Sequence, residues 1–99
     1  MYKFPFEKLE VWQLSRKFVG KIYSISKEWP DYEKFGLINQ VRRAAISISS
    51  NLAEGTSRLS TIDQARFTQI AYSSLMEISN QLILANDLGY IDNELLEEI

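Results

Sequence analysis

Apolar residues recur along this chain with the spacing of helices. In the first segment, steps of three or four separate the members of one stripe, Val11, Leu14, Phe18, Ile22, Ile25 and Trp29. A second stripe lies beside it and consists of Leu9, Trp12, Val19 and Tyr23. Such spacing predicts an amphipathic helix. The two stripes together are wider than the apolar face that one neighbouring layer needs, so we expect this helix to be buried from two directions.

Two further segments show the same periodicity. The stripe of the second is Ile38, Val41, Ala45, Ile48 and Leu52, with small residues around it. Small side chains allow backbones to approach closely, so we expect other helices to crowd against this one. The stripe of the third is Phe67, Ala71, Leu75, Ile78, Leu82 and Ala85, with more apolar residues on both flanks. A helix that is apolar nearly all round is expected to be buried nearly all round.

Residues that end or cap helices separate these segments. They are Trp29-Pro30, Asp31 as a cap for the second helix, Ser60 with Asp63, Gly89, and Asp92. The predicted helices cover residues 7–29, 34–57 and 61–88, with a fourth from about 92. Short connections favour antiparallel neighbours. The predicted fold class is therefore all-α, an up-down-up-down antiparallel four-helix bundle with a short or truncated fourth helix, in a single domain over residues 1–99.

The composition argues against catalysis. The chain has neither His nor Cys, so it lacks the commonest general base, the commonest metal ligand and any thiolate. Glu33, Glu54 and Glu77 lie on different segments and are candidate metal ligands. Helix bundles that bind metal ions through bridging carboxylates also use His, however, and this chain has none. We therefore expect no catalytic residue, no cofactor, no metal and no small-molecule substrate. No apolar run approaches the ~20 residues of a membrane span, and the N-terminus does not resemble a signal peptide, so a cytoplasmic location without membrane attachment is expected.

Charge is divided unevenly along the chain. Residues 1–66 hold all eleven Lys and Arg against seven acids, and residues 67–99 hold six acids and no base. A basic region can attract a polyanion. The candidate phosphate-binding residues are Lys17, Lys21, Arg43, Arg58 and Arg66. The alternative is that these bases form an ordinary solvated surface.

Arg42 lies at the flank of the second helix's apolar stripe, whereas Arg43 points away from it. Glu77 flanks the stripe of the third helix. We therefore expect Arg42 and Glu77 to form a structural ion pair between these two helices.

Apolar side chains exceed what three neighbouring helices can cover, which predicts a homo-oligomer. The candidate interface residues are Phe35, Ile46, Tyr72, Met76 and Ile83. The alternative is a bundle in which missing residues of the fourth helix would cover this surface.

Several motifs together resemble one bacterial four-helix-bundle family, encoded in intervening sequences of large-subunit ribosomal RNA genes. They are Phe6…Leu9-Glu10-Val11-Trp12-Gln13, Trp29-Pro30…Glu33-Lys34-Phe35-Gly36-Leu37…Gln40-Val41-Arg42-Arg43-Ala44-Ala45, Asn51-Leu52-Ala53-Glu54-Gly55…Arg58, Phe67…Ile70-Ala71…Ser74…Glu77…Gln81-Leu82, and Leu88-Gly89-Tyr90-Ile91. The resemblance covers essentially the whole chain.

The resemblance implies a homopentamer without enzymatic activity. The family is similar to the accessory protein of diversity-generating retroelements, which implies RNA, DNA or a reverse-transcriptase-like protein as a partner. Relatives usually carry a longer fourth helix, and the nucleic-acid-binding relatives are basic, whereas the isoelectric point here is about 5.1. The expected function is thus that of a homo-oligomeric binding or scaffolding protein that contacts nucleic acid, or an enzyme that acts on nucleic acid, through basic residues of the first two helices. The alternative is a protein-only scaffold.

Overall fold

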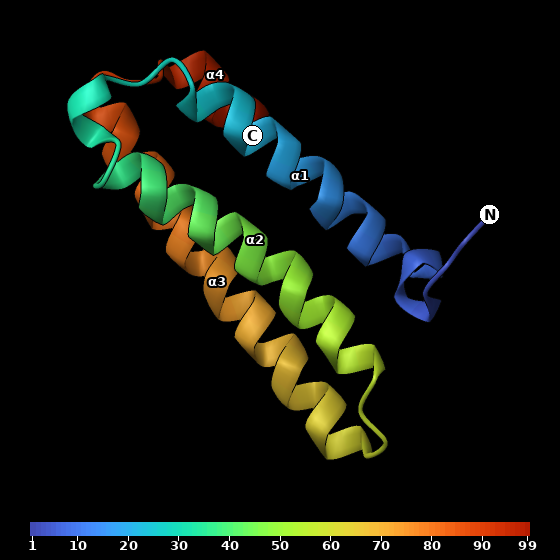
Figure 1. Ribbon diagram of the computed structural model, residues 1–99. Helices are drawn as coiled ribbons and strands as arrows, with labels where there is room; N and C mark the ends of the chain where they lie inside the picture. The colour runs from blue at the N-terminus through green and yellow to red at the C-terminus, as the bar shows by residue number, and fades with distance from the viewer.

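The computed structural model describes residues 1–99, and it contains four α-helices and no strand (Figure 1). The helices are α1 (Glu10–Ser26), α2 (Leu37–Thr56), α3 (Thr61–Asp87) and α4 (Asn93–Glu98). Two short 3-10 turns, η1 (Pro5–Lys8) and η2 (Asp31–Glu33), precede α1 and α2. The all-α prediction is confirmed. None of the helices combines the length and the apolar character that a membrane crossing needs.

The first two helices are shorter than predicted, whereas α3 agrees closely with its predicted range. Proline at the first position of η1 favours a separate turn there, so α1 begins only at Glu10. At the other end, turns occupy the residues between Ser26 and Pro30. Asp31 does not cap α2 as expected. The residue that precedes α2 is Gly36, and a carboxylate oxygen of Glu33 accepts from the first helical N–H, that of Leu37, at 3.1 Å.

Three predicted helix signals are confirmed in atomic detail. The Ser60 hydroxyl accepts from the N–H of Asp63 at 3.1 Å and so caps α3, and the Asp92 carboxylate accepts from Leu95 at 2.8 Å and so caps α4. At the end of α3, Gly89 has a φ of 82°. The N–H groups of Gly89 and Tyr90 bond back to the carbonyls of Asn86 and Ala85, which is the Schellman arrangement.

The second helix is the centre of the fold. It packs along both α1 and α3, as Figure 1 shows for the green ribbon. Its buried residues include Val41, Ala44 and Ala45, which meet Ile22 of α1 and Ile78 of α3 in one apolar core. The expectation that other helices crowd against this one is confirmed. By contrast, no Cα atom of α1 lies within 8 Å of a Cα atom of α3.

A polar contact ties the α1–α2 connection to the α3–α4 corner. The hydroxyl of Tyr90 donates to Glu33 Oε2 at 2.7 Å, and its oxygen also lies 3.3 Å from the hydroxyl of Tyr32. The hydrogen bond from Tyr90, together with that from the Leu37 N–H, lowers the pKa of Glu33 below its ordinary value of 4.5. The bonds to Tyr32 and Glu33 raise the pKa of Tyr90.

The predicted ion pair between Arg42 and Glu77 is absent. Arg42 Nε donates to Ser26 Oγ at 2.8 Å, its Nη2 donates to the Tyr23 carbonyl at 3.3 Å, and its guanidinium lies 4.5 Å from the centre of the Tyr23 ring. Arg42 therefore holds the last turn of α1, where free carbonyls favour a cation. Arg43 is exposed, in agreement with its expected outward position, and it lines a hollow together with Glu77. The helical periodicity correctly placed Arg42 at the flank of the apolar stripe of α2, but it did not show that this flank faces α1 and not α3.

Replacing Glu33 with Gln should destabilise the fold in a pH-dependent way. Because the pKa of Glu33 is lowered in the folded state, its stabilisation is complete above pH 4.5 and is lost as pH falls through the folded value. The free energy of unfolding in urea should thus differ between wild type and Glu33→Gln at neutral pH, and the difference should shrink in acid. The matched control is Glu28→Gln, at an exposed carboxylate without a partner, and a constant difference for Glu33→Gln would contradict this expectation.

Replacing Arg42 with Gln should cost about 1–3 kcal/mol, because a charged donor and a cation–π contact are lost. The same change at the exposed neighbour Arg43 should alter the free energy of unfolding by no more than ~0.5 kcal/mol. Double-mutant cycles in urea then identify the partner. A coupling free energy is expected between Arg42→Ala and Tyr23→Ala and not between Arg42→Ala and Glu77→Ala. Coupling to Glu77 would instead support the ion pair predicted from the sequence.

Candidate functional site

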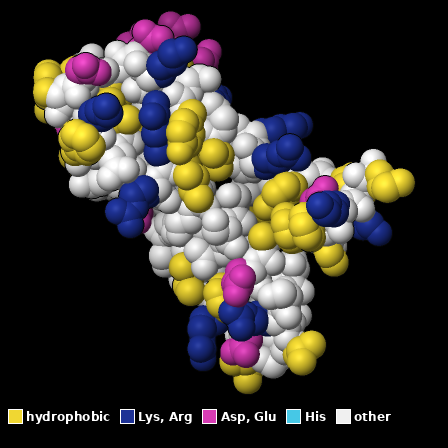
Figure 2. Space-filling view, in the orientation of Figure 1, with side chains coloured by type: hydrophobic (Ala, Val, Ile, Leu, Met, Phe, Trp, Pro, Cys, Tyr) yellow, Lys and Arg dark blue, Asp and Glu magenta, His cyan; other side chains and the backbone are white.

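The five predicted phosphate-binding residues do not converge on one surface. Figure 2 shows Lys and Arg side chains in separate groups on the face in view, with acids beside several of them. Lys17 lines a hollow at the N-terminal part of α1. One turn later, Lys21 Nζ lies 3.4 Å from the carbonyl oxygen of Glu98, next to α4. Arg43 is exposed on the side of α2 near Glu77.

The remaining two bases lie at the opposite end of α2. Arg58 forms an ion pair with Glu54. Its guanidinium also lies 4.5 Å from the centre of the Phe67 ring, which fixes the α2–α3 connection. Arg66 is exposed on α3 without an ion-pair partner. Arg58 therefore has a local structural role, and Arg66 is the basic residue at this end that has no ion-pair partner.

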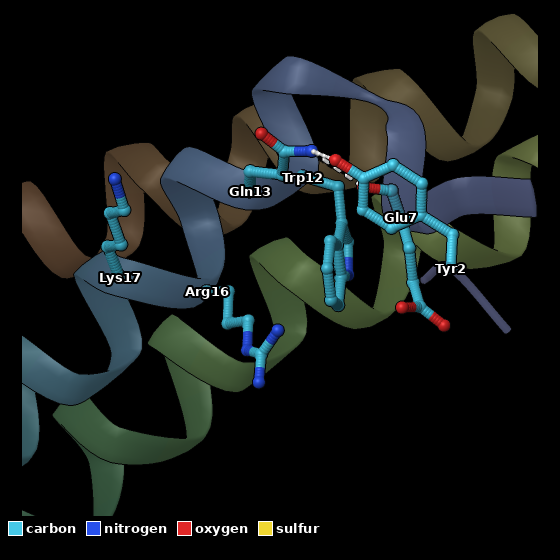
Figure 3. A pocket seen from close by; sticks show the side chains of 6 residues that line it. All are labelled: Tyr2, Glu7, Trp12, Gln13, Arg16 and Lys17. Carbon is cyan, nitrogen blue, oxygen red and sulfur yellow. Dashed lines mark hydrogen bonds between the residues drawn. The ribbon is translucent and has the colours of Figure 1, made fainter. Parts of the chain in front are cut away.

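The hollow beside Lys17 combines aromatic and basic side chains. Its volume is about 470 Å³, and its lining residues are Tyr2, Glu7, Trp12, Gln13, Arg16 and Lys17. Figure 3 shows Arg16 and Lys17 on one side of the Trp12 indole and Tyr2 with Glu7 on the other. The guanidinium of Arg16 lies 5.6 Å from the centre of the Trp12 ring. This is a surface on which a flat, negatively charged ligand would find both stacking and charge.

The N-terminal turn builds one wall of this hollow. Glu7 Oε1 accepts from the backbone N–H groups of Lys3 and Phe4, at 3.1 and 2.8 Å, which closes the turn. Gln13 Nε2 then donates to the Glu7 carbonyl at 2.7 Å and fastens the turn to α1. The Phe6 ring packs edge-on against Trp12, with ring centres 4.9 Å apart.

Arg16 is not among the predicted site residues, and Trp12 belongs to a stripe of the first helix that was expected to be buried. Trp12 is in fact only partly buried, and Tyr2 is exposed. The available signal was the interleaving of aromatic and basic residues over the first part of the chain, from Tyr2-Lys3-Phe4 to Arg16-Lys17. Interleaving alone does not show that the N-terminal turn folds back onto α1.

The predicted interface residues are all exposed in the single chain, namely Phe35, Ile46, Tyr72, Met76 and Ile83. The three on α3 are separated by four and seven residues, so they share one outward face of that helix. Phe35 precedes α2 and Ile46 lies on it, so both are separate from that face.

A second apolar surface lies where α1 and α3 stand apart, and we call it the trough. It contains a hollow of about 390 Å³, whose apolar lining is Phe18, Leu75, Ile78, Leu82, Ile83, Leu96 and Ile99. Leu14 lies one helical turn before Phe18 on the same face of α1 and extends this surface. Leu14, a member of the central apolar stripe of α1, is 60% exposed. The expectation that α1 is buried from two directions is therefore not met within one chain.

The comparison with known families identifies the chain. Residues 7–99 match the family model described as 23S rRNA-intervening sequence protein. No curated protein matches the chain. Since the match covers nearly every residue, from the N-terminal turn through α4, the chain belongs to the 23S rRNA-intervening sequence protein family.

Proposed function

We propose that this protein is a non-enzymatic, homo-oligomeric binding module. The observation that carries the proposal is the trough, because it exposes residues that amphipathic helices normally bury. Leu14 and Ile83 are 60% and 53% exposed. Contiguous apolar patches of this kind are rare on soluble monomers and mark interaction sites.

The occupant of the trough is another copy of the chain. The outward face of α3, made of Tyr72, Met76 and Ile83, is itself apolar and has the helical spacing needed to pack on a second chain. This face adjoins the trough at Ile83, which belongs to both surfaces. If the face enters the trough of the next copy, the contact is heterologous, and it gives a ring where the rotation between copies closes and an open filament where it does not. The family resemblance favours five copies. In each, the helices form an up-down-up-down antiparallel bundle in which the short α4 leaves room for the neighbour.

Sedimentation tests the assembly. The wild-type chain should sediment as a single closed oligomer, and Ile83→Glu should shift it towards the monomer, because a charge at an apolar contact is costly. The matched control is Ile62→Glu, at another exposed isoleucine about 30 Å away along α3, which should leave the oligomer intact. A monodisperse wild-type monomer would refute the proposal.

Nucleic acid is the favoured partner of this oligomer, ahead of a reverse-transcriptase-like protein. Lys17, Arg43 and Arg66 are exposed and have no ion-pair partner, so they are free to meet phosphates. Repetition around a ring multiplies such contacts, and avidity can exceed single-site affinity by ~10²–10⁴ where the geometry permits. The competing proposal, a protein-only scaffold, is supported by the acids of α4 and its flanks, which repel polyanions.

Titration at several salt concentrations separates these two proposals. With structured RNA or duplex DNA, log K should fall with log salt, by ~0.9 for each phosphate neutralised on the duplex. Lys17→Glu should weaken binding more than Lys21→Glu, because the amino group of Lys21 already lies against the Glu98 carbonyl. Lys27→Glu, at an exposed lysine further along the chain, is the control for net charge. An absence of binding at low salt would favour the protein-only scaffold.

A further inference from the structure

We propose that the hollow beside Trp12 receives an unpaired nucleotide of a single-stranded nucleic acid. This inference rests on the proposed nucleic-acid binding and adds to it a site and a preference for single strands over duplex.

The charge of the hollow suits a phosphate. Arg16 and Lys17 are both exposed, and neither has a carboxylate partner. The one acid in the lining is Glu7, and its Oε1 already accepts from two backbone N–H groups of the N-terminal turn. In Figure 3 the Glu7 carboxylate lies on the far side of Trp12 from Arg16 and Lys17. The basic side of the hollow is therefore open to an anion.

The aromatic side chains suit a base. Trp12 packs against Phe6 with the two rings steeply inclined to each other, and it is only partly buried, so part of its indole remains accessible. The exposed ring of Tyr2 stands on the same side as Glu7 (Figure 3). Stacking of bases on aromatic rings beside basic residues is the general mode of single-strand recognition.

Gln13 adds a hydrogen-bonding group at the rim. Its Nε2 donates to the Glu7 carbonyl at 2.7 Å and to the Tyr2 hydroxyl at 3.3 Å, and both bonds fix the orientation of the amide. Its Oε1 accepts no hydrogen bond within the chain and points away from Tyr2 in Figure 3. That oxygen can accept from the amino group of a base.

A nucleotide can place its base in this hollow only if the base is unpaired. At about 470 Å³ it falls in the range of ~300–1,000 Å³ that is usual for small-ligand sites. A base that is stacked and paired inside a helix does not present its face to such a hollow, whereas an unpaired base can swing out and stack. Duplex can therefore reach Arg16 and Lys17 with its phosphates but cannot place a base on Trp12.

Tryptophan fluorescence gives a direct readout of this site. The chain has two tryptophans, and Trp29 is 5% exposed, so Trp29→Phe leaves Trp12 as the sole reporter and keeps an aromatic ring in the core. In this background, single-stranded RNA and DNA oligonucleotides should quench Trp12, and duplex of the same sequence should not. A difference between the RNA and DNA arms would show which sugar the site prefers, and quenching by either supports the proposal.

Two double variants test the charge of the hollow. The first pair, Arg16→Gln with Lys17→Gln, removes two positive charges within the hollow. The control pair, Lys27→Gln with Lys34→Gln, removes two positive charges away from it. The first pair should weaken single-strand binding at least about tenfold and reduce the salt slope by about 1.4, at ~0.7 for each phosphate lost. The control pair should change both much less. Circular dichroism and sedimentation of each variant verify its helices and its assembly.

The outcomes separate this inference from the proposed function. Single strands could bind the wild type without quenching Trp12, and with an affinity that Arg16→Gln with Lys17→Gln does not change. In that case the hollow beside Trp12 is not the binding site, and nucleic acid binds elsewhere on the oligomer. If no nucleic acid binds at low salt, both fail. Quenching by duplex equal to that by single strands would also overturn the site.

Discussion

The close approach of α2 to α3 is the constraint on which the rest of the structure depends. The two helices meet through small side chains, and the hydroxyl oxygens of Ser47 and Ser74 lie 2.8 Å apart across the contact. At the far end of α2, Gly55 is buried, and a Cβ atom there would stand 3.2 Å from Phe67 Cβ, tighter than most such contacts. Because α1 packs on another side of α2, two sides of the central helix are occupied within the chain. Apart from exposed residues of α2 such as Arg43, the surfaces proposed for binding therefore lie on α1 and α3.

The same arrangement creates the trough. With α2 between them, α1 and α3 cannot bring their backbones together, and α4, only six residues long, fills one end of the gap. Side chains such as Leu14 and Leu75 then stay in water, although full burial of one such side chain contributes ~1.5–3 kcal/mol. The proposed oligomer would recover this free energy without any change of the packing around α2.

Features that depend on residues close together in the chain could be predicted from the sequence. Features that depend on contacts with a distant segment could not. The caps Ser60 and Asp92 and the stop at Gly89 act within one helical turn, so their residues suffice to predict them. The partner of Arg42 depends on which side of α2 receives α1, and a helical wheel does not contain that information. Likewise, the hollow beside Trp12 exists only because Glu7 and Gln13 fasten the N-terminal turn to α1.

Net charge is a poor guide to the charge beside Trp12, because the acids of α4 lie near the other end of α1. Figure 1 places the N-terminus and α4 near opposite ends of α1, in a molecule about 44 Å long. Trp12 lies nine residues before Lys21, about 13 Å along the helix axis, whereas charges are screened over ~8–10 Å. Lys21 in turn lies against α4 at Glu98 and offsets part of its negative charge. The acids of α4 therefore act mainly at that end of the molecule, and the charges in the hollow beside Trp12 are those of Arg16 and Lys17 together with Glu7.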